Sequence, residues 1–80
     1  MTHAQDTAEK LRKIVAGQLS IVVDTIKDES TFDELGADSL DRVEIIMKIE
    51  EAFDVELDDD KAEKILNFGE LRQYVETLRQ

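Results

Sequence analysis

Apolar residues recur every three or four positions along most of this 80-residue chain, the spacing of one face of an α-helix. The chain contains no cysteine, so neither a disulfide nor a thiolate metal site can stabilise it. It also contains no proline, which suits helices joined by turns. A chain of this length forms at most one domain, with a core one layer deep. Its stability therefore has to come from the packing of helices.

The first half of the chain is predicted to form one helix followed by a long loop. The helix covers residues 5–20. Its apolar positions are Ala8, Leu11, Ile14, Val15, Leu19 and Val22. Residues 21–34 show no clean helical period, and we expect Ile26 and Phe32 to anchor this segment in the core. The segment exceeds the usual length of a connection, which indicates a structural or functional role.

A turn at residues 35–38 leads into a second helix, which is predicted over residues 39–53. Asp38 is a suitable N-cap, because its carboxylate can accept hydrogen bonds from the free N–H groups of the first turn. Asp41 follows three positions later, where a capping box has its acidic partner. The start of this helix is therefore well defined by the sequence.

A short third helix and a longer last helix complete the prediction. The third begins at residues 58–60 and runs to Leu66. Its apolar side consists of Ala62, Ile65 and Leu66. Asn67 and Glu70 form a further cap-like pair that opens the last helix. The apolar positions of that helix are Leu71, Tyr74, Val75 and Leu78. The expected fold is an all-α bundle of three main helices and one short helix, with residues 1–80 as a single domain.

The charge of the chain is strongly acidic and uneven. Twenty acidic residues against ten basic ones give a net charge of −10 at pH 7. Residues 28–63 hold fifteen of the acids and three of the bases. Such a charge repels nucleic acid phosphates and anionic membranes and attracts basic patches on other proteins. Disorder is not expected, because 41% of the residues are hydrophobic and they recur at helical spacing.

No signal peptide or membrane-spanning run is recognisable in the sequence. The expected location is therefore the cytoplasm, although a cleaved organelle presequence would leave no trace. The expected state is a monomer that does not insert into membranes.

The predicted second helix has an unusual distribution of side chains. On a helical wheel, residues 38–53 fall on three arcs. The arc expected to face the core consists of Ile45, Ile46, Ile49 and Phe53. A mostly acidic arc consists of Asp41, Glu44, Lys48 and Glu51. A second apolar arc consists of Leu40, Val43 and Met47. This second arc either packs against a neighbouring helix or docks a partner protein, and its acidic rim favours docking.

Ser39 stands at the first position of this helix, after a turn that contains a glycine. A helix N-terminus has free N–H groups and a positive dipole end, so it tolerates an attached phosphate, although Asp38 and Asp41 oppose one. From spacing alone, an ordinary helix-start serine is the favoured interpretation. A catalytic serine is disfavoured further, because the only histidine is His3, near the N-terminus.

Residues 35–41 read Leu-Gly-Ala-Asp-Ser-Leu-Asp, which resembles the phosphopantetheine attachment motif of acyl carrier proteins. The similarity continues through residues 43–47, 50–54 and 62–65 to Tyr74. The short motif by itself is moderately specific. Together with the length, the acidic charge and the downstream matches, it is highly specific and covers essentially the whole chain.

The resemblance implies a carrier protein that is a substrate of enzymes rather than an enzyme itself. Ser39 would be modified by a phosphopantetheinyl transferase, which takes 4′-phosphopantetheine from coenzyme A. The thiol of that arm would carry acyl groups as thioesters to the ketosynthase and other enzymes of fatty-acid synthesis. The implied partner-docking residues are Asp38, Leu40, Asp41, Glu44, Met47 and Glu51. The implied acyl-pocket residues are Val43, Ile46, Leu57, Ala62 and Ile65.

Departures from the family pattern leave other functions open. Between Phe32 and Leu35 the chain is one residue shorter than many bacterial fatty-acid carriers, so a dedicated carrier of a polyketide, aminoacyl or other specialised pathway is the alternative. Arg42 and Lys48 put positive charge on an otherwise acidic helix, which could tune partner choice.

Two alternatives come from other classes of protein. A calcium-binding domain is disfavoured, because residues 58–60 are consecutive aspartates without the alternating ligands and central glycine of an EF-hand loop. An interaction module with an unmodified Ser39 remains possible, and the intact mass of the native protein would distinguish it.

Overall fold

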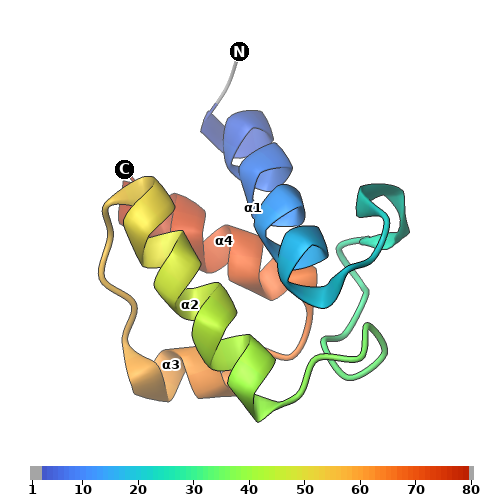
Figure 1. Cartoon of the computed structure of the whole chain (residues 1–80). Coiled ribbons are helices and arrows are strands. Elements are labelled where there is room, and N and C mark those ends of the chain that lie inside the picture. Colours follow the sequence, from blue (N-terminus) through green and yellow to red (C-terminus); the bar gives the residue numbers. More distant parts are fainter. Residues whose placement is uncertain (1–2, 80) are drawn as a thin grey trace.

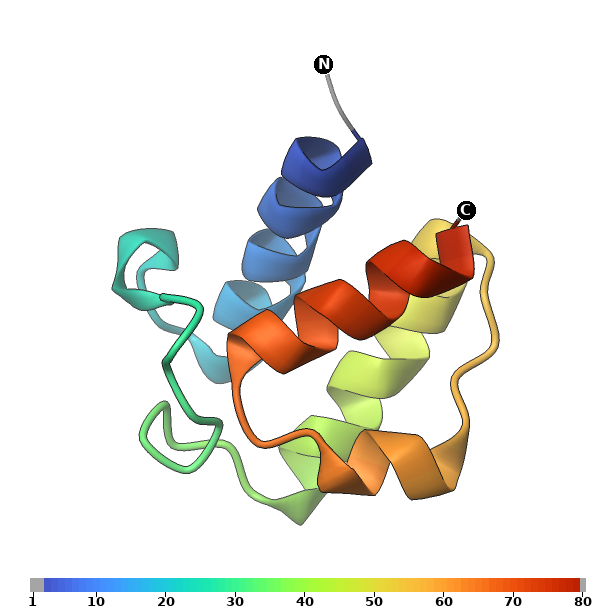
Figure 2. The ribbon, with the colours of Figure 1, turned by 180° about the vertical axis from the view of Figure 1, so that it is seen from behind.

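The computed structural model describes residues 3–79, and the side chains of residues 6–79. The elements are α1 (His3–Leu19), the single-turn 3₁₀ helix η1 (Val23–Thr25), α2 (Ser39–Phe53), α3 (Asp59–Lys64) and α4 (Phe68–Arg79). Helix α1 packs against both α2 and α4, and the short α3 lies beside the first turns of α2 (Figures 1 and 2). No strand occurs among the described residues. The expected all-α four-helix fold is confirmed.

Helix α1 ends earlier than the sequence pattern predicted. It stops at Leu19 because Ser20 adopts a left-handed conformation with φ of 58°. The N–H of Ile21 closes the end by donating to the carbonyl of Ala16 at 3.1 Å. Val22 was predicted to extend the apolar face, and this is wrong: its side chain is 66% exposed. The reversal at Ser20 turns the chain away before Val22 can reach the core.

The long segment between α1 and α2 is held to the bundle at the two predicted anchors. Ile26 is 2% exposed and Phe32 is 5% exposed. The carbonyl of Ile26 accepts a hydrogen bond from Arg12 Nε at 3.2 Å, and the N–H of Phe32 donates to the carbonyl of Leu66 at 3.1 Å. The single-turn helix η1 in this segment was not predicted, because three residues are too few to show a period. Both predicted anchors are confirmed.

Helix α2 has the predicted bounds, and its start is fixed by a complete capping box. The N–H of Asp41 donates to Asp38 Oδ1 at 2.8 Å, and the N–H of Asp38 donates to Asp41 Oδ2 at 3.3 Å. Gly36, with φ of 87°, allows the tight turn just before the cap. The helix ends where Asp54 takes a left-handed conformation. Ser39 is thereby fixed as the first helical residue.

We expect Asp38→Ala to lower the free energy of unfolding by about 1 kcal/mol, because it leaves the first-turn N–H groups without the cap acceptor. Asp38→Asn is the matched control, since it retains the Oδ1 acceptor and should cost at most a few tenths of that amount. Urea denaturation followed by circular dichroism measures both. Equal losses in the two variants would contradict the role given to the cap.

Helix α3 is shorter than predicted. The carboxylate of Asp58 caps it by accepting from the N–H groups of Asp60 at 2.9 Å and Lys61 at 3.3 Å. The helix ends at Lys64, and the prediction that Leu66 contributes to its apolar side is wrong, because Leu66 is 61% exposed. Beyond Lys64 the backbone becomes extended at Ile65, so helical spacing no longer places residue 66 on the buried side.

Helix α4 starts at the predicted cap and completes the core. The N–H of Glu70 donates to Asn67 Oδ1 at 2.8 Å. The first helical residue, Phe68, is fully buried, although the prediction did not place it in the core. Its N–H donates to the carbonyl of Ser30 at 2.9 Å, and that of Gly69 donates to the carbonyl of Asp28 at 2.8 Å. A Cβ on Gly69 would lie 3.0 Å from that carbonyl oxygen, so glycine permits this close approach.

The core lies between α1, α2 and α4. Its buried members are Leu11, Val15, Ala16, Ile26, Phe32, Ile45, Ile49, Leu57, Ile65, Phe68, Leu71 and Val75.

The buried hydroxyl of Thr7 accepts a hydrogen bond from Arg79 at 2.7 Å, which joins the described ends of α1 and α4. Arg72 hydrogen-bonds Glu76 at 2.8 Å and Asp28 at 3.1 Å, and these carboxylates, Glu76 first, raise the pKa of the Arg72 guanidinium. The ion pair between Arg72 and Asp28 ties the long loop to α4.

Candidate functional site

Ser39 is exposed at the N-terminus of α2, where the adjoining depression faces α3. The depression is lined by Ser39, Arg42, Val43, Ile46, Asp59, Ala62 and Glu63. Among the described residues, no side chain hydrogen-bonds the Ser39 hydroxyl, so within that part of the chain nothing activates it as a nucleophile. The hydroxyl is instead accessible to a modifying enzyme.

The surroundings of Ser39 fit a covalently attached phosphodiester. The positive end of the α2 dipole lies at this position, which favours a phosphate. Asp38 and Asp41 are already engaged with each other's backbone N–H groups in the capping box. An exposed hydroxyl without packing constraints leaves room for a long prosthetic arm. The residues present therefore fit phosphopantetheine.

The second apolar arc of α2 does not pack against a neighbouring helix. Leu40 is 65% exposed, Val43 is 53% exposed and Met47 is 54% exposed. Asp38 and Glu51 are also exposed, whereas Asp41 and Glu44 are half-buried. The residues predicted for docking thus lie together along one side of α2, four of them exposed and two half-buried.

Gln18 of α1 holds two of these carboxylates in place. Its amide Nε2 donates to Glu44 Oε2 at 2.6 Å and to Asp41 Oδ1 at 3.2 Å. Its Oε1 accepts from Lys48 Nζ at 2.7 Å. Sequence reasoning did not find this contact, because residues 18 and 41 belong to different helices and no local pattern links them.

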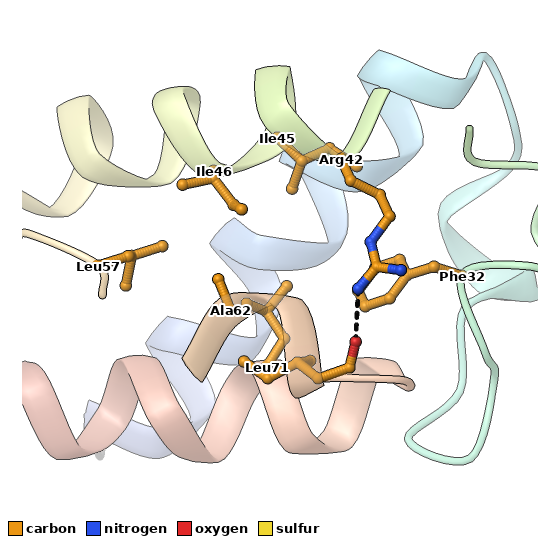
Figure 3. Close-up of a pocket in the computed structure, with 8 residues that line it drawn as sticks. Phe32, Arg42, Ile45, Ile46, Leu57, Ala62 and Leu71 are labelled. Atoms are coloured by element: carbon orange, nitrogen blue, oxygen red, sulfur yellow. Dashed lines mark hydrogen bonds between the residues drawn. The ribbon is translucent and has the colours of Figure 1, made fainter. Parts of the chain in front are cut away.

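Behind the depression, a small apolar pocket lies between α2, α3 and α4 (Figure 3). It is lined by Phe32, Arg42, Ile45, Ile46, Leu57, Ala62, Ile65 and Leu71. Its volume is about 20 Å³, enough for about one water molecule. Four of the five predicted pocket residues line it. The fifth, Val43, lies instead in the depression beside Ser39.

Arg42 is the lining residue that sequence reasoning misplaced. It was treated as surface charge, but its guanidinium turns toward the pocket and donates to the carbonyl of Ile65 at 2.7 Å. The guanidinium also lies over the ring of Phe32, 5.7 Å from the centroid. Its spacing of three and four positions from Ile45 and Ile46 was the available signal, since that spacing puts it on the core face of α2.

The described residues contain no group of three or more His, Cys, Asp or Glu side chains placed to hold a metal ion. The consecutive aspartates at 58–60 instead cap α3 through Asp58. In the same part of the chain, no helix is both long and apolar enough to cross a bilayer.

Comparison with known proteins identifies the family. Residues 9–75 match the family described as Phosphopantetheine attachment site. A solved structure of the acyl carrier protein from Enterococcus faecalis is 30% identical in sequence, with a TM-score of 0.81. The match covers 98% of this chain and 99% of that one. A carrier of phosphopantetheine, rather than an enzyme, is what these similarities show. The chain therefore belongs to the phosphopantetheine attachment family, as an acyl carrier protein.

Proposed function

We propose that Ser39 is the residue that carries the phosphopantetheine arm and that the chain delivers acyl thioesters to enzymes of fatty-acid synthesis. The observation that carries this proposal is the exposed Ser39 hydroxyl at the capped start of α2, in a chain that belongs to a phosphopantetheine attachment family. The arm would supply a thiol, which the cysteine-free chain itself lacks. Residues 1–80 would act as a single carrier domain in the cytoplasm.

The attachment step requires only an accessible oxygen from this chain. The Ser39 Oγ would attack the β-phosphorus of coenzyme A, forming one P–O bond while the bond to the 3′,5′-ADP leaving group breaks. The hydroxyl proton would pass to a base of the transferase, because none of the described side chains hydrogen-bonds Ser39. The chain contributes the position of the oxygen, which the capping box fixes.

We further propose that Asp38, Leu40, Asp41, Glu44, Met47 and Glu51 form the docking surface for the transferase, the ketosynthase and other acyl-processing enzymes. The support is an exposed apolar strip with carboxylates beside it, in the most acidic part of the chain. Opposite charge on a partner would accelerate encounter, and the apolar strip would prolong contact. Gln18 would act as a positioning residue for Asp41 and Glu44.

We expect Glu44→Lys to weaken the apparent affinity for a fatty-acid ketosynthase and for the transferase by about tenfold at low salt, since it opposes basic partner patches. Asp41→Lys should act in the same direction, with an added loss of stability because it removes half of the capping box. Glu29→Lys makes the same charge change on the exposed loop and serves as the control. Enzyme kinetics at 20 and 200 mM salt measure the effect, which screening should reduce. If Glu29→Lys weakened binding as much as Glu44→Lys, net charge rather than this surface would be responsible.

An acyl chain that enters the interior would be sheltered by Val43, Ile46, Leu57, Ala62 and Ile65. Val43 lies beside Ser39, and the other four line the pocket, so together they extend from the attachment point toward the interior. A pocket of about 20 Å³ has to expand to hold an alkyl chain. Because α3 is only six residues long, its displacement is the expected route of expansion.

A dedicated carrier of a specialised pathway is the second candidate. The short segment between Phe32 and Leu35 and the inward Arg42 favour it, whereas the Gly-Ala-Asp-Ser-Leu-Asp motif favours fatty-acid work. Mass spectrometry of the protein purified from its native cells distinguishes the two, because it identifies the attached acyl groups. Saturated alkyl chains on Ser39 would support fatty-acid synthesis, and aminoacyl or polyketide groups would support a specialised pathway.

A further inference from the structure

Arg42 occupies the boundary between the attachment site and the interior. It lines both the depression that contains Ser39 and the internal pocket, and it shares that position only with Ile46 and Ala62 among the described lining residues. The direct path from Ser39 to the pocket therefore runs past these three side chains. Arg42 alone among them carries a charge. In Figure 3 its side chain extends from α2 across one end of the pocket, with Leu57 at the other end.

The guanidinium is held in this position by two contacts from different segments. It donates to the Ile65 carbonyl at 2.7 Å, at the C-terminal end of α3, and it lies over the Phe32 ring at 5.7 Å. A charge-assisted hydrogen bond in a partly buried place is among the stronger polar contacts in a protein. A cation is also favourable beside the last carbonyls of a helix. The position of the Arg42 guanidinium at the end of the pocket is therefore well stabilised.

The same hydrogen bond ties the end of α3 to α2. Only Ala62 is buried within α3 itself, so apolar packing holds this helix weakly. Its N-terminal side is held separately, where the N–H of Asp58 donates to the Tyr74 hydroxyl at 2.9 Å and the N–H of Leu57 donates to Glu50 at 3.0 Å. Release of the Arg42 contact would leave the C-terminal side of α3 held only by the buried Ile65 side chain and by the hydrogen bond from the Phe32 N–H to the Leu66 carbonyl at 3.1 Å.

We infer that Arg42 is a gate residue that decides which acyl groups this carrier shelters. With the gate closed, the guanidinium excludes alkyl chains from the pocket, and a chain that reaches past Arg42 has to displace it from Ile65 and Phe32. Medium-length alkyl groups therefore stay largely exposed to partner enzymes on this carrier. The inference rests on the proposed attachment at Ser39 and adds a specificity determinant to it.

The test uses the full chain loaded with 8-fluorooctanoyl-phosphopantetheine by a broad-specificity transferase. Fluorine NMR reports whether the end of the acyl chain lies in water or among apolar side chains. We expect the terminal fluorine to be mostly exposed in the unsubstituted protein. In Arg42→Met the ratio of buried to exposed fluorine should rise about tenfold, the factor expected for loss of one charge-assisted hydrogen bond. Arg42→Lys should lie between the two, because lysine keeps the charge but not the planar donor group.

Lys48→Met is the matched control, since Lys48 lies on the same helix but contacts Gln18 on the surface. It should leave the fluorine ratio unchanged. A terminal fluorine already buried in the unsubstituted protein, or an equal ratio in Arg42→Met and the unsubstituted protein, would overturn the gate. Far-UV circular dichroism establishes that each variant is folded before the ratios are compared.

A second measurement needs no prosthetic arm. In the unmodified protein, amide hydrogen exchange at residues 62–65 should be about tenfold faster in Arg42→Met than in Lys48→Met, because the end of α3 loses its hydrogen bond to α2. Equal exchange rates would reject the gate even if Ser39 is modified as proposed. If intact mass showed that the transferase loads none of the proteins, the attachment site would be rejected instead. The exchange rates would then decide by themselves whether Arg42 acts as a gate.

Discussion

Ser39→Ala is expected to abolish phosphopantetheinylation completely while leaving the helical bundle folded. The substitution removes the only oxygen proposed to form the phosphodiester. The fold should be unaffected within about 0.5 kcal/mol, because Ser39 is exposed and Asp38, not Ser39, caps the helix. Incubation with coenzyme A and a broad-specificity transferase, followed by intact mass spectrometry, measures the modification. Circular dichroism measures the fold.

Ser20→Gly is the matched control for this experiment. Ser20 is also an exposed serine at the end of a helix, but its left-handed backbone suits glycine, so the variant should fold well. It should be modified at the same rate as the unsubstituted protein. Modification that persists in Ser39→Ala would refute the site, as would an unsubstituted protein that stays at its unmodified mass.

Phe68→Ala is expected to have the largest effect on stability, lowering the free energy of unfolding by about 3–5 kcal/mol. The Phe68 side chain is fully buried and is the largest of the fully buried side chains in the described part of the chain. The guanidinium of Arg12 lies over its ring, 5.2 Å from the centroid, and would lose this contact as well. A domain of this size has only about 4–12 kcal/mol of stability in total, so the variant should lose a large share of it. Urea titration measures the change.

Phe53→Ala provides the comparison, because Phe53 is only half-buried at the end of α2. Two cations lie over its ring, Arg79 at 4.8 Å and Lys10 at 5.9 Å from the centroid. Its loss should cost about 1–2 kcal/mol, from less buried area and one or two exposed cation–π contacts. Equal destabilisation of the two phenylalanine variants would contradict the conclusion that Phe68 contributes more to the core than Phe53.

Local patterns predicted those parts of the fold in which the physical cause is also local. The bounds of α2 follow from a cap at Asp38 and a helical period that reaches Phe53, and both causes lie within the segment. Ile26 and Phe32 were found because isolated apolar residues in a polar loop have few favourable places other than the core. The exposed apolar arc of α2 was likewise visible in the sequence, because the helix has more apolar residues than one face packed against the core can use.

The errors occurred where a helix ends without a clear signal in the sequence, or where contacts between distant segments decide the outcome. Val22 and Leu66 continue a helical period in sequence, but the backbone leaves the helix before each of them. Phe68 looked like a residue of a cap, and it is buried because loop carbonyls at Asp28 and Ser30 bind the start of α4. In the candidate site, the motif alone was enough to select Ser39. The inward direction of the Arg42 side chain could not be predicted, because it depends on where the Ile65 carbonyl lies in the folded chain.

The sequence by itself determined the helical class, the start of α2, the acidic surface and the resemblance that points to Ser39, because each depends on neighbouring residues or on composition. Only the tertiary structure decided how large the pocket is, which carboxylates Gln18 holds and that a charged side chain lines the pocket. These features depend on distances between helices. Such distances are set by the packing of the whole core, and no short stretch of sequence contains them.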